Sequence, residues 1–110
     1  MAKWVDIGKL EAFPEAEHRV VSAGPIECVV SNIEGQIYAA HNRCPHMAMP
    51  IGTGQLRGCV LTCPFHGFAY DIRTGRNVDF DDTPLRTYPA RTTGTGRVEV
   101  DVEPNDDDNE

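Results

Sequence analysis

Two short segments, Cys44-Pro45-His46 and Cys63-Pro64-Phe65-His66-Gly67, hold two of the four cysteines and two of the four histidines of the 110-residue chain. Each segment combines one thiol and one imidazole with residues typical of tight turns. A turn can direct neighbouring side chains toward one point, whereas a strand sends successive side chains to opposite faces. The sequence therefore predicts two loops that bring two sulfur and two nitrogen ligands to one site.

The ligand types and their spacing restrict the metal that such a site would bind. Thiolate and imidazole together suit zinc or an iron–sulfur cluster. Zinc ligands usually come as Cys-x2-4-Cys and His-x3-5-His pairs. Both pairs are mixed here, Cys-x-His and Cys-x2-His. Two irons bridged by sulfide fit this spacing better, because each loop can place its cysteine on one iron and its histidine on the other.

The double motif, Cys44-x-His46 and Cys63-x2-His66-Gly67 with each cysteine followed by proline, resembles that of the Rieske [2Fe–2S] family. Residues flanking the loops extend the resemblance over most of the chain: Glu34-Gly35, Tyr38-Ala39-Ala40, Tyr70-Asp71, Thr74-Gly75 and Leu85 to Pro89. The resemblance implies one [2Fe–2S] cluster whose inner iron is held by Cys44 and Cys63 and whose outer iron is held by His46 and His66.

Two neutral imidazoles in place of two thiolates make the oxidised cluster neutral, so an incoming electron meets less repulsion than in a four-cysteine cluster. In high-potential members of the family each loop carries an extra cysteine; Met49 and Phe65 stand at those positions here. Phe68 replaces a serine that hydrogen-bonds a sulfide, whereas Tyr70 is kept. The resemblance therefore implies a potential of about −150 mV, at the low end of the Rieske range.

Alternating apolar and polar residues predict short strands and an all-β fold. Residues 26–41 read as a β-hairpin, and residues 98–102 as a half-buried strand. Residues 10–18 are compatible with a loop or a single helical turn. Four more segments are strand candidates: 4–8, 19–22, 59–62 and 69–72. Taken with the resemblance, this predicts a Rieske-type fold of antiparallel strands in stacked sheets, with a cluster-binding subdomain made of two loops.

One domain over residues 1–103 accounts for almost the whole chain, with its cluster-binding part at about 42–70. Residues 104–110 are acidic and free of apolar side chains, so we expect a disordered tail. The formal net charge of −7 argues against nucleic acid and favours a partner with a basic docking face. No apolar run approaches the roughly 20 residues of a membrane span, and no signal peptide is recognisable, so we expect a cytoplasmic protein.

Apolar residues surround the candidate ligands in sequence: Met47, Met49, Pro50, Ile51, Phe65 and Phe68. They could cover the cluster against water, form an exposed collar that docks on redox partners, or do both. Cys28 and Cys59 lie outside the two motifs and are expected to be buried, inert thiols on strands. His41 is close enough to Cys44 to support the site, although an ordinary strand-end histidine is the simpler interpretation.

The resemblance implies a soluble Rieske ferredoxin rather than an enzyme. Such a protein takes one electron from a flavin-containing NAD(P)H reductase and passes it to a terminal oxygenase, commonly one that hydroxylates aromatic rings in bacterial catabolism. The alternative is the small Rieske subunit of an enzyme complex such as assimilatory nitrite reductase. The polar C-terminal strand and the acidic tail favour a monomeric carrier, because a permanent subunit needs an extended apolar interface.

Overall fold

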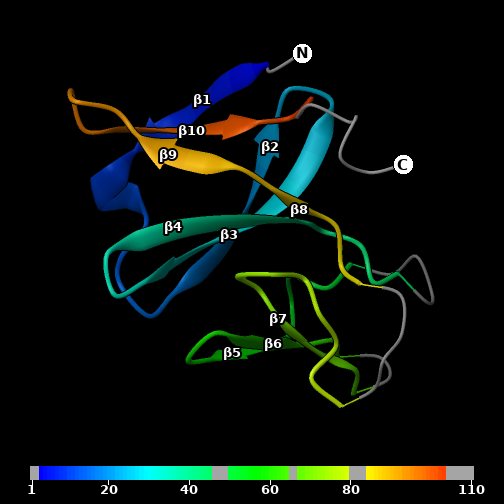
Figure 1. Ribbon diagram of the computed structural model, residues 1–110. Helices are drawn as coiled ribbons and strands as arrows, with labels where there is room; N and C mark the ends of the chain where they lie inside the picture. Colours follow the sequence, from blue (N-terminus) through cyan, green and yellow to red (C-terminus); the bar gives the residue numbers. More distant parts are fainter. Residues whose placement is uncertain (1–2, 46–49, 65–66, 80–83, 104–110) are drawn as a thin grey trace.

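The computed structural model describes residues 3–45, 50–64, 67–79 and 84–103, which form three antiparallel sheets. The first sheet joins β1 (Trp4–Lys9), β10 (Arg97–Asp101) and β9 (Ala90–Thr92). The second joins β2 (His18–Ala23), β3 (Ile26–Ile33), β4 (Gln36–His41) and β8 (Thr87–Tyr88). The third joins β5 (Gln55–Arg57), β6 (Val60–Thr62) and β7 (Ala69–Asp71). Figure 1 shows the second sheet between the other two.

The all-β prediction is confirmed, and so is the hairpin over residues 26–41. Its two strands pair from Cys28 with His41 to Ile33 with Gln36, and Glu34 and Gly35 form the two-residue turn with φ of 54° and 87°. Positive φ at both positions is the type I′ geometry that suits the twist of a hairpin. The segment after β1, for which a loop and a helical turn were both compatible, contains a single 3-10 turn, η1 (Leu10–Ala12).

The central strand β3 is buried on both faces, although its alternating sequence is typical of a strand with one exposed face. Cys28 and Val30 pack into one core with the first sheet, while Val29 packs into a second core with the third sheet. Strand β4 divides in the same way, with Ala39 facing the first core and Ala40 the second. The β3–β4 hairpin is therefore the layer that both cores share.

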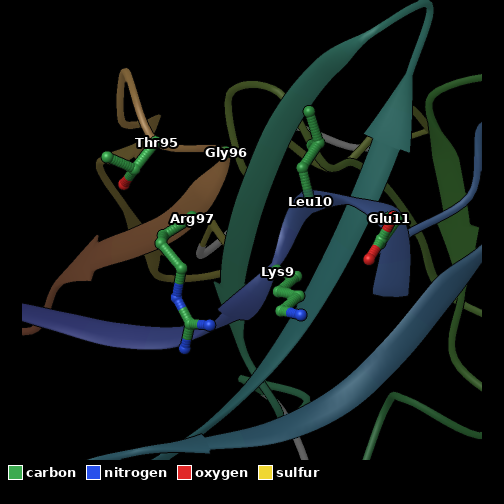
Figure 2. Close-up of a pocket in the computed structure, with 6 residues that line it drawn as sticks. All are labelled: Lys9, Leu10, Glu11, Thr95, Gly96 and Arg97. Atoms are coloured by element: carbon green, nitrogen blue, oxygen red, sulfur yellow. The ribbon is translucent and has the colours of Figure 1, made fainter.

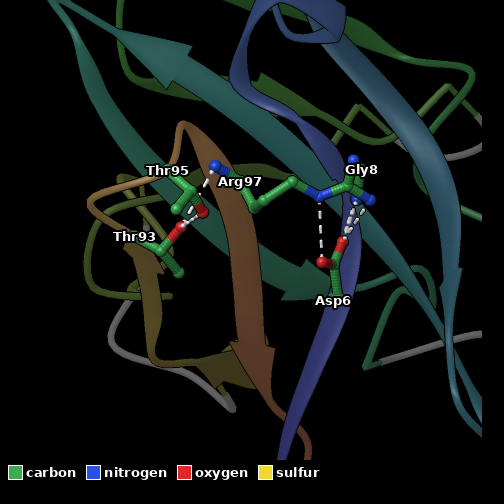
Figure 3. Close-up of polar contacts among 5 residues, drawn as sticks. All are labelled: Asp6, Gly8, Thr93, Thr95 and Arg97. Carbon is green, nitrogen blue, oxygen red and sulfur yellow. Dashed lines mark hydrogen bonds and ion pairs between the residues drawn. The ribbon is translucent and has the colours of Figure 1, made fainter.

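Polar contacts on the first sheet tie β1 to β10 (Figure 3). The guanidinium of Arg97 donates two 2.9 Å hydrogen bonds to the carboxylate of Asp6, which also accepts 2.9 Å from the Gly8 amide. These contacts hold the pKa of Asp6 below its usual value. The sequence Thr93-Gly94-Thr95-Gly96 is typical of a turn, and it forms one between β9 and β10, with the Thr93 and Thr95 hydroxyls 3.0 Å apart.

The second core lies between the third sheet and the β3–β4 hairpin. Besides the hairpin residues it contains side chains that are no more than 2% exposed: Ile51, Leu61, Tyr70, Ile72 and Leu85. Strands β5, β8 and β9 were not expected from the sequence, because each has only two or three residues and depends on its sheet partners. Within the described residues, no helix has the length and apolar character needed to cross a bilayer.

Gly75 closes the turn that returns the chain from β7 toward Leu85. Its amide bonds the Asp71 carbonyl at 2.6 Å, and its carbonyl accepts 2.7 Å from the Leu85 amide. Its φ is 85°, and a Cβ at this position would overlap the Leu85 carbonyl oxygen. Only glycine satisfies both the positive φ and the close approach of the two segments.

Gly75→Ala should therefore lower the free energy of unfolding by at least about 2 kcal/mol, the combined cost of left-handed backbone and steric overlap. Gly94→Ala is the matched control, because Gly94 has open space around its Cα and no positive φ. Denaturant unfolding of the two variants measures the difference. Equal stability of both variants would show that the Gly75 turn adjusts freely.

Candidate functional site

Two cysteines from different loops meet in the second core. Cys44 comes three residues after the end of β4, and Cys63 directly follows β6. Their side chains are 0% and 1% exposed, belong to one hydrophobic cluster and form no disulfide. Thiols that are buried, reduced and brought together from separate loops fit a thiolate-bound metal site.

Tyr70 of β7 lies in the same core as both cysteines. Its hydroxyl is 3.9 Å from the Sγ atom of Cys44, a distance suited to a hydrogen bond to sulfur. Burial is the main cause that raises the pKa of Tyr70, and both Cys44 and Cys63 raise it further. The hydroxyl therefore stays protonated, as a donor must. Tyr70, which the family resemblance keeps, therefore lies within hydrogen-bond reach of a candidate ligand sulfur.

Asn42 clamps the two ends of the first loop. Its Nδ2 donates 2.7 Å to Oε1 of Glu27 on β3, and its Oδ1 accepts 2.6 Å from the Gly52 amide. The imidazole Nε2 of His18 lies 3.0 Å from the Gly52 carbonyl oxygen. The Glu27 contact thus holds the start of the loop to the second sheet, and the two contacts at Gly52 hold its far end.

The second loop is closed by its own backbone and packed against the first. The Cys63 amide donates 2.7 Å to the Phe68 carbonyl, and the Gly67 amide donates 3.0 Å to the Cys63 carbonyl. Gly54 approaches the Thr62 carbonyl so closely that a Cβ there would overlap it. Because Thr62 precedes Cys63, this approach brings the end of the first loop beside the start of the second.

The other candidate site residues divide between described and undescribed positions. Pro50 is exposed, Phe68 is half-buried against the second core, and Ile51 is fully buried within it. Ile51 is therefore part of the core and not of an exposed collar. The remaining candidates lie outside the described residues: His46, His66, Met47, Met49 and Phe65.

The cysteines and histidines outside the motifs behave differently from one another. Cys28 is buried on β3, and burial raises the pKa of its thiol to about 11, which keeps it inert as expected. Cys59 is only half-buried and precedes β6, so the expectation of a buried strand thiol was wrong there. His41 ends β4 with its ring edge-on to Tyr88, in agreement with a strand-end role.

Two surface depressions lie on different sides of the molecule. One, of about 520 Å³, borders the second loop and is lined by residues that include Arg57, Cys63 and Gly67. The other, of about 480 Å³, lies between β1 and β10 and is lined by Lys9, Arg97 and their neighbours. Figure 2 shows that this second depression holds none of the candidate site residues.

Asn42 and the close-packed Gly52 and Gly54 were not identified from the sequence. Asparagine just after a strand, and glycine within a loop, are each common turn residues, so neither residue type indicates that Asn42 would bind the Gly52 amide. Only the pairing of β3 with β4 brings Glu27 within reach of Asn42, from 15 residues earlier in the chain.

Comparisons with known proteins agree with this geometry. The family model described as the Rieske [2Fe-2S] domain matches residues 3–89. The ferredoxin component of a naphthalene 1,2-dioxygenase system from Pseudomonas aeruginosa is 35% identical, covering 91% of this chain and 96% of that protein. The anthranilate 1,2-dioxygenase ferredoxin subunit of Burkholderia cepacia is 33% identical, covering 93% and 94%.

A solved structure extends the likeness to three dimensions. It is a complex of reduced oxygenase and oxidised ferredoxin in carbazole 1,9a-dioxygenase. The matching chain has a TM-score of 0.80 and 27% identity, with 89% of this chain and 92% of that chain covered.

Asn42→Ala should loosen the first loop and lower the free energy of unfolding by about 1–3 kcal/mol, because the Gly52 amide loses its acceptor and Glu27 loses its donor. Glu27→Gln keeps an acceptor oxygen for Asn42 and should change stability by less than about 1 kcal/mol. Denaturant unfolding and iron content per chain would be compared for both. Unchanged stability and iron content in Asn42→Ala would contradict the clamp.

Proposed function

The chain belongs to the Rieske [2Fe-2S] domain family, and we propose that it carries single electrons from a flavin-containing NAD(P)H reductase to a terminal oxygenase that hydroxylates aromatic rings. The observation that carries the proposal is that Cys44 and Cys63, from separate loops, are buried in one core with Tyr70, whose hydroxyl lies 3.9 Å from the Cys44 sulfur. The relatives named above are ferredoxin components of aromatic dioxygenase systems. They favour the carrier over the subunit of an assimilatory nitrite reductase.

We assign one [2Fe–2S] cluster to the two loops. Cys44 and Cys63 would hold the inner iron, and His46 and His66 the outer iron. The described residues fit this group, because two buried thiols from separate loops lie in one core and a hydroxyl lies within hydrogen-bond reach of one of them. The donor set as a whole, two thiolates with two imidazoles, has the chemistry of a Rieske centre.

When bound, a cluster of this kind accepts one electron and gives it up again. The protein around it controls how readily that happens. Ile51, Leu61 and Ile72 exclude water from the cysteine side, since each is no more than 1% exposed. Tyr70 donates toward the Cys44 sulfur, and a donor to sulfur stabilises the more negative, reduced state.

The electrons balance over two carriers. One NAD(P)H delivers a hydride, hence two electrons, to the flavin of the reductase. The flavin passes them singly to two molecules of this protein, and each molecule delivers one electron to the oxygenase. No proton transfer or bond formation falls to this chain, so it is an electron-transfer component. Its monomeric state and cytoplasmic location stay predictions.

The purified protein should contain two irons and two acid-labile sulfides per chain, and its reduced form should show a rhombic electron paramagnetic resonance signal. It should then reoxidise when mixed with the terminal oxygenase of a naphthalene dioxygenase system. Iron and sulfide analysis, followed by stopped-flow absorbance, measures both steps. A colourless protein with one zinc per chain would refute the assignment.

Tyr70→Phe should lower the reduction potential by about 40 mV, the equivalent of one hydrogen bond of about 1 kcal/mol in a one-electron couple. Tyr38→Phe is the control, because its ring packs against the same core. Spectroelectrochemical titration measures the potentials. A potential equal to wild type in Tyr70→Phe would show that the hydroxyl does not donate to the cluster.

A further inference from the structure

Charge is divided unevenly between the two ends of the protein. Residues 42–89 contain five arginines and four carboxylates, whereas the rest of the chain contains five lysines and arginines and 13 carboxylates. Asp81 and Asp82, two of the four carboxylates in the first group, lie outside the described residues. The segments outside residues 42–89 therefore carry a formal charge of −8 and residues 42–89 a charge of +1. Glu27 of β3, a carboxylate from outside residues 42–89, contacts the start of the first loop.

Arginines lie beside the entry to the first loop. Arg43 is exposed and directly precedes Cys44, and its amide bonds the His41 carbonyl at 2.8 Å. Arg86 is exposed too: its carbonyl accepts 2.8 Å from the His41 amide, and its guanidinium lies 5.3 Å from the Tyr88 ring centroid. Burial and the nearby charges of Arg43 and Arg86 lower the pKa of His41. Two cations thus flank one histidine at this edge.

A third arginine borders the second loop. Arg57 ends β5, is exposed, and lines the depression of about 520 Å³ together with Cys63 and Gly67. The hydroxyl and amide side chains that line it as well are uncharged: Thr53, Gln55 and Thr62. Among the described residues, no carboxylate lines this depression.

Several other cations are paired with carboxylates, among them Arg73, whose guanidinium lies 2.9 Å from the Asp71 carboxylate, and three at the first sheet. Arg97 binds Asp6 at 2.9 Å, Arg91 binds Glu99 at 2.8 Å, and Lys3 lies 3.9 Å from Glu103. No ion pair within the described part of the chain involves Arg43 or Arg57. The positive charge of these two arginines therefore remains available to a partner.

We infer that the protein docks through a basic rim, defined as Arg43, Arg57 and Arg86, and that its terminal oxygenase presents carboxylates opposite this rim. The inference rests on the proposed function and reverses the docking polarity that the net charge alone favours. Charges more than about 8 Å away are largely screened at physiological ionic strength, so the rim outweighs the remote acidic sheets at close approach.

Two small oxidants of opposite charge test whether the surface next to the loops is basic or acidic. The reduced protein would be mixed in a stopped-flow instrument with hexacyanoferrate(III) or with hexaammineruthenium(III). If the rim controls approach, oxidation by the anion slows as salt rises, while oxidation by the cation accelerates. The opposite pair of salt dependences would overturn the inference, because it would show that the net charge governs approach.

Charge-reversing substitutions test which residues control the approach of the oxidant. Arg43→Glu and Arg57→Glu should each slow oxidation by hexacyanoferrate(III) by about three- to tenfold at low ionic strength. Lys9→Glu makes the same change of formal charge on β1, beside the remote depression, and should change the rate less than about twofold. Equal effects of all three substitutions, or faster oxidation in the two arginine variants, would overturn the inference.

The reduction potential, an equilibrium quantity, tests whether an acidic partner binds at the rim. A glutamate decapeptide, used as a stand-in for the oxygenase surface, should lower the reduction potential of the wild-type protein by placing negative charge near the cluster. The shift should shrink in Arg43→Glu and Arg57→Glu and persist in Lys9→Glu. No shift in the wild-type protein would contradict the basic rim.

A protein without a reducible cluster would refute the proposed function, whereas an intact cluster with reversed salt dependence would refute only the docking polarity.

Discussion

Burial of the β3–β4 hairpin on both faces is the constraint from which the rest of the structure follows. Val29 and Ala40 contribute to the core beneath the cysteine loops, while Val30 and Ala39 contribute to the core of the terminal strands. A chain of 110 residues has little apolar surface to bury. Because the hairpin is buried on both faces, it contributes apolar side chains to both cores. The hairpin also leads through its last residue, His41, directly into the first loop, so the same layer positions the site.

The cysteine loops depend on close contacts between segments remote in sequence. Asn42 joins Glu27 to Gly52, and Gly54 lies against the Thr62 carbonyl. These contacts place Cys44 and Cys63 in a dry core, where a hydrogen bond between Tyr70 and the Cys44 sulfur has more electrostatic effect than it would in water. The same loops end at a surface edged by arginines. Under the proposed function, the buried cysteine side would hold the cluster and the basic rim would meet the partner.

The division of charge changes how the composition should be interpreted. A distant partner experiences the net charge of −7, which comes from the carboxylates outside residues 42–89. At contact, screening restricts the interaction to groups within about one Debye length. Ion pairs such as Arg97 with Asp6 further neutralise the cations of the first sheet, whereas Arg43 and Arg57 keep their charge at the loop side.

The sequence by itself determined the candidate ligands, the β3–β4 hairpin and the turn at residues 93–96, because these features depend on residue types at short spacing. Alternating side chains and turn residues act locally, so their pattern can be interpreted without a structure. Only the tertiary structure decided the strands β5, β8 and β9, the clamp by Asn42 and the half-buried position of Cys59. It also decided that Ile51 is core and that the positive charge gathers beside the cysteine loops. Each of these depends on segments that meet in space although they are distant in the chain, and a local pattern does not indicate which distant segments will meet.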